Sequence, residues 1–132
     1  MEENTKKLQK VLIVEDDNFL GDLLIDHITK SGVNASLCRD AESALEEIKK
    51  EAPALLLLDL LLPGMDGYAL LRKLKELNIL SSISVIILSN LSQTEKIQEG
   101  IELGVKDFLG KSNYDLDDIT KRVHEILAEI KQ

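Results

Sequence analysis

An unbroken apolar run, Ala54-Leu55-Leu56-Leu57-Leu58, is the strongest constraint on how this chain folds. A five-residue run that is apolar on both faces predicts a central strand of a parallel sheet, buried on both sides. The carboxylate of Asp59 follows directly, at the end of the strand where open α/β sheets place their ligands. Strand packing does not require an acid there, and the turn that follows already has Pro63-Gly64 and the better cap Asp66. Asp59 is therefore predicted to be a functional residue.

Apolar segments of strand and helix periodicity alternate along the rest of the chain. Strands are predicted at residues 11–14, 35–38, 54–58, 83–88 and 105–109. Helices are predicted after each strand, with N-caps at Asp17, Asp40, Asp66 and Asp115 and a capping box at Ser92-Gln93-Thr94-Glu95. The last helix is expected to place Leu116, Ile119, Val123, Ile126, Leu127 and Ile130 on its inner face. Right-handed crossovers then predict an α/β fold, a doubly wound five-stranded parallel sheet of order 2-1-3-4-5 with five helices.

Composition limits the class of protein. A chain of 132 residues suits one domain, and with 3% aromatic residues and no Trp its core must be aliphatic. The net charge of −8 argues against binding of nucleic acid or an anionic membrane as the main role. The single cysteine, Cys38, rules out an internal disulfide and a cysteine-based zinc site. We find no signal peptide or long apolar segment, and we expect a cytoplasmic protein with a polar tail at residues 1–9 and one domain at residues 10–131.

Polar residues follow four of the predicted strands, and in a parallel sheet all of these strand ends lie on one edge. They are Glu15, Asp16 and Asp17 after the first strand, Asp59 after the third, Ser89-Asn90 after the fourth and Lys111 after the fifth. The crevice between strands one and three is the predicted ligand site, because the direction of the connections reverses there.

The carboxylates of this site favour a cation. Two carboxylates ~4 Å apart repel by roughly 4 kcal/mol at an effective dielectric near 20, so the site either takes up a proton or binds a cation. A set of oxygen ligands suits Mg²⁺, with Mn²⁺ as a substitute. The cation in turn suits a phosphoryl group, and an Asp facing it can act as a nucleophile that becomes an acyl phosphate.

The constellation resembles the receiver domain of two-component response regulators over roughly residues 9–131. The matching stretches are Val11-Leu12-Ile13-Val14-Glu15-Asp16-Asp17, Leu58-Asp59 with Leu62-Pro63-Gly64-Met65-Asp66-Gly67, Leu88-Ser89, and Asp107-Phe108-Leu109-Gly110-Lys111. The resemblance implies a signalling switch that receives a phosphoryl group from a histidine kinase or phosphotransfer protein and then alters binding to a downstream protein.

The resemblance also implies a role for individual residues. Asp59 is the phospho-acceptor, Asp16 a direct Mg²⁺ ligand and Glu15 a ligand through a metal-bound water. The Leu61 backbone carbonyl is a further metal ligand, while Ser89 and Lys111 bind the phosphoryl group. Phe108 stands at the position of the aromatic switch residue. Asp107 and Arg122 match positions that form cross-subunit ion pairs in transcription-factor receivers, which makes a homodimer through this face one expectation and an ordinary exposed pair the alternative.

The chain departs from the family pattern near the site. Ser112 replaces the proline that usually follows the lysine, and a cis bond before a non-proline residue costs about 3 kcal/mol. Asn90 replaces a small residue, and Leu61 and Leu91 occupy positions that flank the phosphoryl group. Apolar side chains there predict slow hydrolysis of the acyl phosphate.

Two alternatives compete with the switch. A pseudo-receiver would keep the fold as a protein-binding module, but retention of Asp16, Asp59, Ser89 and Lys111 argues against it. A haloacid-dehalogenase-type phosphatase, the enzyme alternative, needs a second Asp two residues after its nucleophile, where this chain has Leu61. His27 is expected at the boundary of the core and His124 in solvent, and Asp115, Asp117 and Asp118 are expected to cap the last helix.

Overall fold

A parallel sheet with helices on both faces forms the described part of the protein, which a computed structural model covers over residues 9–89, 94–111 and 115–131. The strands are β1 (Val11–Val14), β2 (Ala35–Cys38), β3 (Leu55–Leu58), β4 (Ser84–Ser89) and β5 (Asp107–Gly110). The helices are α2 (Asn18–Lys30), α3 (Ala41–Lys50), α4 (Gly67–Glu76), α5 (Thr94–Glu102) and α6 (Leu116–Lys131), with a short 3₁₀ helix η1 (Leu80–Ser82).

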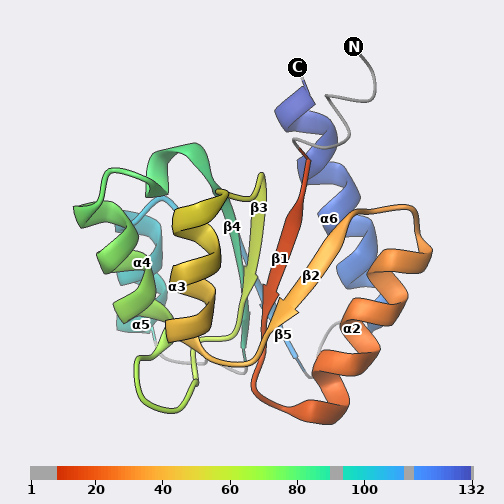
Figure 1. Ribbon diagram of the computed structural model, residues 1–132, viewed down its shortest axis with the longest axis horizontal. Helices are drawn as coiled ribbons and strands as arrows, with labels where there is room; N and C mark the ends of the chain where they lie inside the picture. Colours follow the sequence, from red (N-terminus) through yellow and green to blue (C-terminus); the bar gives the residue numbers. More distant parts are fainter. Residues whose placement is uncertain (1–8, 90–93, 112–114, 132) are drawn as a thin grey trace.

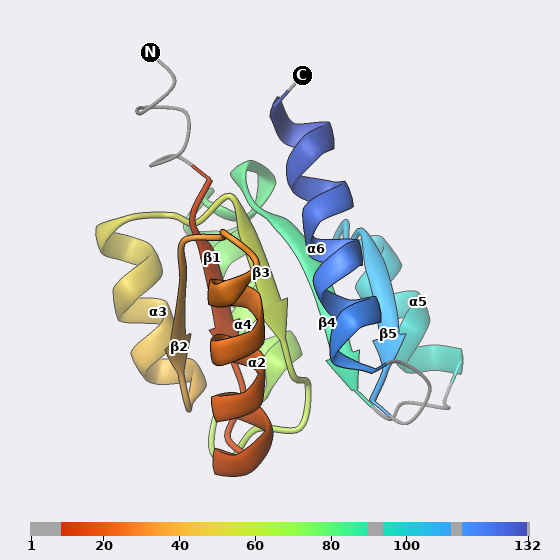
Figure 2. The same ribbon diagram turned by 90° about the vertical axis from the view of Figure 1, so that its right-hand side faces the viewer.

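The strand order is β2-β1-β3-β4-β5 and every neighbouring pair is parallel, which confirms the predicted topology. Helices α3, α4 and α5 cover one face of the sheet, and α2 and α6 cover the other (Figure 1). Figure 2 shows α2 and α6 side by side along that second face. Among the described residues, no helix has both the length and the apolar character needed to cross a membrane.

Every position of the central strand β3 needs an apolar residue, because both faces of this strand are buried. Leu56 and Leu58 pack into the cluster under α3 and α4, whereas Leu55 and Leu57 pack into the cluster under α2 and α6. All four side chains are at most 1% exposed. Burying one such side chain contributes about 1.5–3 kcal/mol, so this strand anchors both halves of the core.

Acidic N-caps begin the helices as predicted. Asp17, Asp40 and Asp66 accept hydrogen bonds from the backbone N–H groups of Leu20, Ser43 and Ala69 at 3.0, 2.7 and 2.8 Å. Asp115 accepts one from Asp118 N–H at 2.8 Å, while the Asp118 carboxylate accepts one from Asp115 N–H at 3.4 Å. The predicted capping box at residues 92–95 lies outside the residues and side chains that the structure describes.

The last two elements differ from their predictions. Strand β5 begins at Asp107 rather than at Val105, because the Val105 N–H bonds to the Gly100 carbonyl at 3.0 Å and still closes helix α5. The prediction that Ile130 lies on the inner face of the last helix is wrong, since Ile130 is 41% exposed. The end of α6 extends past the edge of the sheet, beyond the strands that cover its earlier turns (Figure 1).

Candidate functional site

The backbone hydrogen bonds of the sheet continue past the carboxyl ends of its strands to the residues of the site. The Glu15 N–H donates to the Cys38 carbonyl at 3.1 Å and the Asp59 N–H to the Val14 carbonyl at 3.0 Å. The Lys111 N–H donates to the Ser89 carbonyl at 3.2 Å. Residues far apart in sequence are therefore held together by backbone hydrogen bonds that continue the pairing of the strands.

Three carboxylates converge at this edge, as the sequence predicts. Glu15, Asp16 and Asp59 each offer an oxygen atom, and these atoms all lie within 4.8 Å of one another. Glu15 and Asp59 are 1% and 3% exposed, whereas Asp16 is open to solvent. Burial raises the pKa of Glu15 to about 7, and the Asp59 carboxylate adds to this effect.

Lys111 links the two buried carboxylates. Its Nζ lies 3.0 Å from Asp59 Oδ2 and 3.0 Å from Glu15 Oε1. Burial alone disfavours the ammonium ion, but its contacts with Glu15 and Asp59 outweigh that cost and raise the pKa of Lys111. Three carboxylates against one ammonium leave two negative charges uncompensated when all are ionised, which is the charge of one divalent cation.

The Asp59 carboxylate is held from two sides. Its Oδ1 accepts a hydrogen bond from the Leu61 N–H at 3.1 Å, while Oδ2 accepts one from Lys111 Nζ at 3.0 Å. Gly67, at the start of α4, packs directly behind this loop, because a Cβ there would lie 2.8 Å from the Asp59 carbonyl oxygen. Only glycine lets α4 begin so close to the strand end that carries Asp59.

Ser89 ends β4 with a buried hydroxyl. The residue is 5% exposed, and its Oγ makes no hydrogen bond to any residue within the described ranges. A buried hydroxyl without a partner is costly in a native fold, so it suits a site that receives an oxygen-rich ligand. The predicted residues Asn90, Leu91 and Ser112 lie outside the described residues.

Two further predicted residues, Leu61 and Phe108, lie on segments that follow β3 and form β5. Leu61 lies in the loop after Asp59 with its side chain 65% exposed, and the role of its carbonyl oxygen as a metal ligand stays a prediction. Phe108 is half-buried and packs against the core under α5. A Cβ on Gly100 would lie 2.5 Å from Phe108 Cζ and 2.8 Å from the Tyr68 hydroxyl, so these three residues form one close contact. We did not predict the parts of Gly100 and Tyr68, because only the packing of α5 on the sheet reveals them.

Asp107 and Arg122 pair with each other within the chain. Arg122 Nε lies 2.6 Å from Asp107 Oδ2, and its Nη1 lies 3.2 Å from Glu125 Oε1. Both residues of the first pair are about one-third exposed, at 31% and 33% of the side chain. A role at a dimer face stays a prediction.

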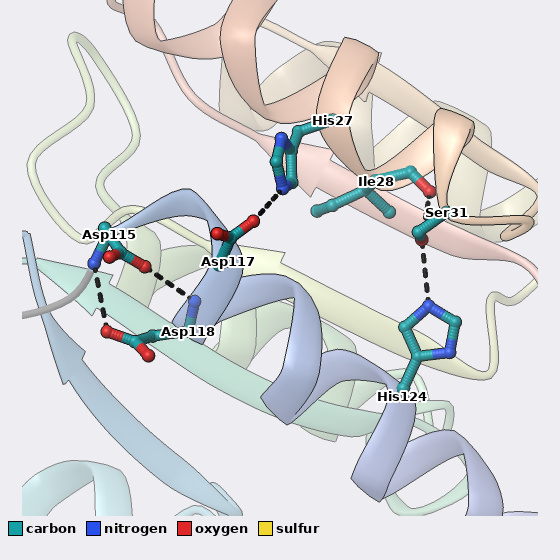
Figure 3. A network of polar contacts seen from close by, with 7 residues as sticks. All are labelled: His27, Ile28, Ser31, Asp115, Asp117, Asp118 and His124. Carbon is teal, nitrogen blue, oxygen red and sulfur yellow. Dashed lines mark hydrogen bonds and ion pairs between the residues drawn. The ribbon is translucent and has the colours of Figure 1, made fainter.

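The two histidines take part in polar contacts between α2 and α6 (Figure 3). His27 Nε2 lies 2.9 Å from Asp117 Oδ1. Asp117 therefore lies in the first turn of α6 and also contacts α2. Ser31 Oγ donates to the Ile28 carbonyl at 2.6 Å and therefore accepts from His124 Nε2 at 2.8 Å. His27 is partly exposed as expected for the core boundary, and His124 is exposed but hydrogen-bonded.

Comparisons with known proteins agree with this geometry. The family model for the response regulator receiver domain matches residues 11–124. Sporulation initiation phosphotransferase F of Bacillus subtilis is 34% identical over 119 residues, which cover 90% of this chain and 94% of that protein. Transcriptional regulatory protein BaeR of Escherichia coli is 34% identical over 99% of this chain but only 52% of its own length. The chain spans about half the length of several curated relatives that it matches.

Solved structures share the fold closely. The receiver domain of the Francisella response regulator 1452 has a TM-score of 0.83 and 30% identity, covering 92% of this chain and 98% of that one. The signal receiver domain of a histidine kinase from Syntrophus aciditrophicus has a TM-score of 0.82 and 31% identity, covering 94% and 93% of the two chains.

Proposed function

Because the chain belongs to the family of response regulator receiver domains, we propose that Asp59 is the residue on which it accepts a phosphoryl group. The observation that carries this proposal is the position of Asp59, which is a 3% exposed acid at the end of the central strand. Its two oxygens contact one ammonium and one backbone N–H. No packing requirement accounts for a buried carboxylate there.

The proposed chemistry is a displacement at phosphorus. A carboxylate oxygen of Asp59 attacks the phosphorus atom of a phosphohistidine on the donor protein, so that an O–P bond forms while the N–P bond breaks. The imidazole leaves with the bonding electron pair. Lys111 and the unpartnered Ser89 hydroxyl would then bind oxygens of the transferred group, which adds positioning and charge neutralisation.

The donor set fits Mg²⁺, with Mn²⁺ as a substitute. Glu15, Asp16, Asp59 and the Leu61 carbonyl would hold the ion, and they offer only oxygen atoms, the ligands that this cation prefers. Bound Mg²⁺ would supply positive charge that neutralises the carboxylates and the phosphoryl oxygens. The residues alone leave two negative charges unmatched, which is the reason for a divalent ion.

The partners follow from the family. We propose a histidine kinase or a histidine phosphotransfer protein as donor in the cytoplasm, and a downstream protein that reads the face built from α5, β5 and α6. The relatives include transcriptional regulatory proteins and a sporulation phosphotransferase, so either a homodimer through Asp107 and Arg122 or direct binding of a partner would transmit the signal. The acceptor domain would span residues 10–131 after a tail at residues 1–9, bind neither nucleic acid nor a membrane itself, and act as a switch rather than as an enzyme.

Intact mass after treatment with acetyl phosphate and Mg²⁺ tests the acceptor. We expect wild type to gain one phosphoryl group and Asp59→Asn to gain none, because the amide lacks the anionic oxygen that attacks phosphorus. Asp66→Asn is the matched control, since Asn also caps helices well and should leave labelling intact. Labelling of Asp59→Asn at wild-type yield would overturn the assignment.

A further inference from the structure

An open cavity lies at the amino end of the sheet, at the opposite end of the strands from Asp59. Its volume is about 500 Å³. The end of α4, the connection through η1 into β4 and the connection from α5 to β5 line it. Ser84, the first residue of β4, and Lys106, just before β5, both belong to this lining.

The charge of this cavity differs from that of the rest of the molecule. The chain carries a net charge of −8, yet the lining contains Lys75 and Lys106 and no Asp or Glu. Neither lysine forms an ion pair with any residue in the described part of the chain. Lys75 also borders a neighbouring groove that contains Glu76, Glu99 and Glu102, but these carboxylates do not line the cavity itself. Within the cavity the two lysines form a positive patch that attracts an anion.

Neutral donors accompany the lysines. The hydroxyls of Ser81 and Ser84 and the side-chain amide of Asn78 also belong to the lining, and none of these side-chain groups is hydrogen-bonded to another described residue. Ser82 is different, since its hydroxyl donates to the Ile79 carbonyl at 2.8 Å. Core side chains, among them Leu80 and Ile83, supply an apolar part of the wall.

We propose that this cavity binds a small phosphate monoester, with its phosphate on Lys75 and Lys106. A phosphate dianion matches the charge of two ammonium ions, and its oxygens accept hydrogen bonds from the serine and asparagine donors. A cavity of this volume falls in the size range of small-molecule sites, so it has room for an organic body as well as for the phosphate. The lining has no aromatic side chain for a base to stack on, which favours a sugar phosphate over a nucleotide.

Amide chemical shifts measured during titration with ribose 5-phosphate test this site. In Mg²⁺-free buffer we expect saturable shifts confined to residues 75–84 and 103–106, which include the lining. Lys75→Gln combined with Lys106→Gln should weaken binding ~tenfold or more, because each lysine provides a charge-assisted hydrogen bond. Lys73→Gln combined with Lys121→Gln is the matched control, since these exposed lysines form no ion pair among the described residues and lie outside the lining.

Additional ligands and variants show which groups of the ligand and of the protein cause binding. Free ribose should not bind, and inorganic phosphate should bind more weakly than the ester. Ser84→Ala should weaken binding without removing a charge, and Asp59→Asn should bind as wild type does, which separates this site from the proposed phospho-acceptor. Equal affinity of the two double-lysine variants would overturn the proposal, as would shifts restricted to the Lys111 edge or the absence of saturation. Equal binding of inorganic phosphate would exclude a site for the organic body.

Discussion

Glu15 is a carboxylic acid in an environment that disfavours its charge. It is 1% exposed, and burial raises its pKa to about 7 from 4.5, while the Asp59 carboxylate acts in the same direction. The Lys111 ammonium and the Asp17 N–H oppose the shift, the latter through a 3.1 Å hydrogen bond to Oε2. In the metal-free protein this carboxyl group therefore keeps its proton at a pH where an exposed Glu has lost it.

The stability of the metal-free protein should reflect that raised pKa. Between pH 4.5 and about 7 the folded state binds a proton on Glu15 that the unfolded state releases, so stability falls as pH rises through this window. Thermal melting at several pH values should show a decline that Glu15→Gln reduces. Glu76→Gln, at an exposed position, should keep the wild-type profile. An unchanged slope in Glu15→Gln would show that another group causes the decline.

Asp16 should matter for the cation and little for the fold. Its side chain is exposed, so Asp16→Asn should leave the metal-free melting temperature nearly unchanged or raise it by relieving repulsion. Loss of one anionic ligand should weaken Mg²⁺ binding ~tenfold or more. The rise in melting temperature during a Mg²⁺ titration measures this. Binding as tight as in wild type would mean that Asp16 is not a ligand.

At the scale of elements, the packing of helix α5 depends on Gly100, which lies against the ring of Phe108. A Cβ at residue 100 would lie 2.5 Å from Phe108 Cζ, closer than such atoms approach in folded proteins. Gly100→Ala gains about 1 kcal/mol of helix propensity, but overpacking costs about 1–3 kcal/mol. Because the clash involves a bulky ring that is half-buried against the core, we expect net destabilisation.

Urea unfolding of a set of variants separates these two effects. Gly100→Ala should destabilise the wild-type background, yet be neutral or stabilising when Phe108→Ala and Tyr68→Phe are present. Equal destabilisation in both backgrounds would show that the cost comes from the α5 backbone rather than from the ring and the hydroxyl.

The loop between β3 and α4 should control the lifetime of the phosphorylated state. Leu61 is 65% exposed, so a polar side chain at this position costs little stability and would help to orient water for attack. Leu61→Asn should therefore speed loss of the phosphoryl group several-fold, as measured by decay of phosphoprotein after donor removal. Leu77→Asn, at another exposed leucine, is the control. A decay as slow as in wild type would show that Leu61 does not limit water access.

Elements with a strong local signal were predicted well from sequence. The apolar run at residues 54–58 and the caps Asp17, Asp40 and Asp66 each combine a pattern with a local physical cause. The structure confirms the caps and a central strand in this run, which spans Leu55–Leu58. The start of β5 and the exposure of Ile130 were mispredicted, because they depend on where α5 closes and where the sheet ends. Neither of these is encoded in local periodicity.

For the molecule as a whole, strand order and the position of the site followed from few rules. An apolar run on both faces places β3 in the centre, and right-handed crossovers then leave one simple topology. The convergence of Glu15, Asp16, Asp59 and Lys111 follows from that topology alone. The contacts of Lys111 with both carboxylates could not be predicted from topology, because they depend on the conformation of the lysine side chain. No sequence motif marks the cavity at Lys75 and Lys106, because its lining comes from separate segments that only the fold brings together.

The contact of Tyr68 with Gly100 and Phe108 also has an optical consequence. The chain has no tryptophan and two tyrosines, so no indole absorbs near the phenol bands or accepts their excitation energy. Tyr68 is 5% exposed and packed in a chiral environment, which should give it a near-ultraviolet circular dichroism signal that depends on this packing. A change in the Phe108 ring position would then be readable in the unlabelled protein, without a reporter that could disturb the contact.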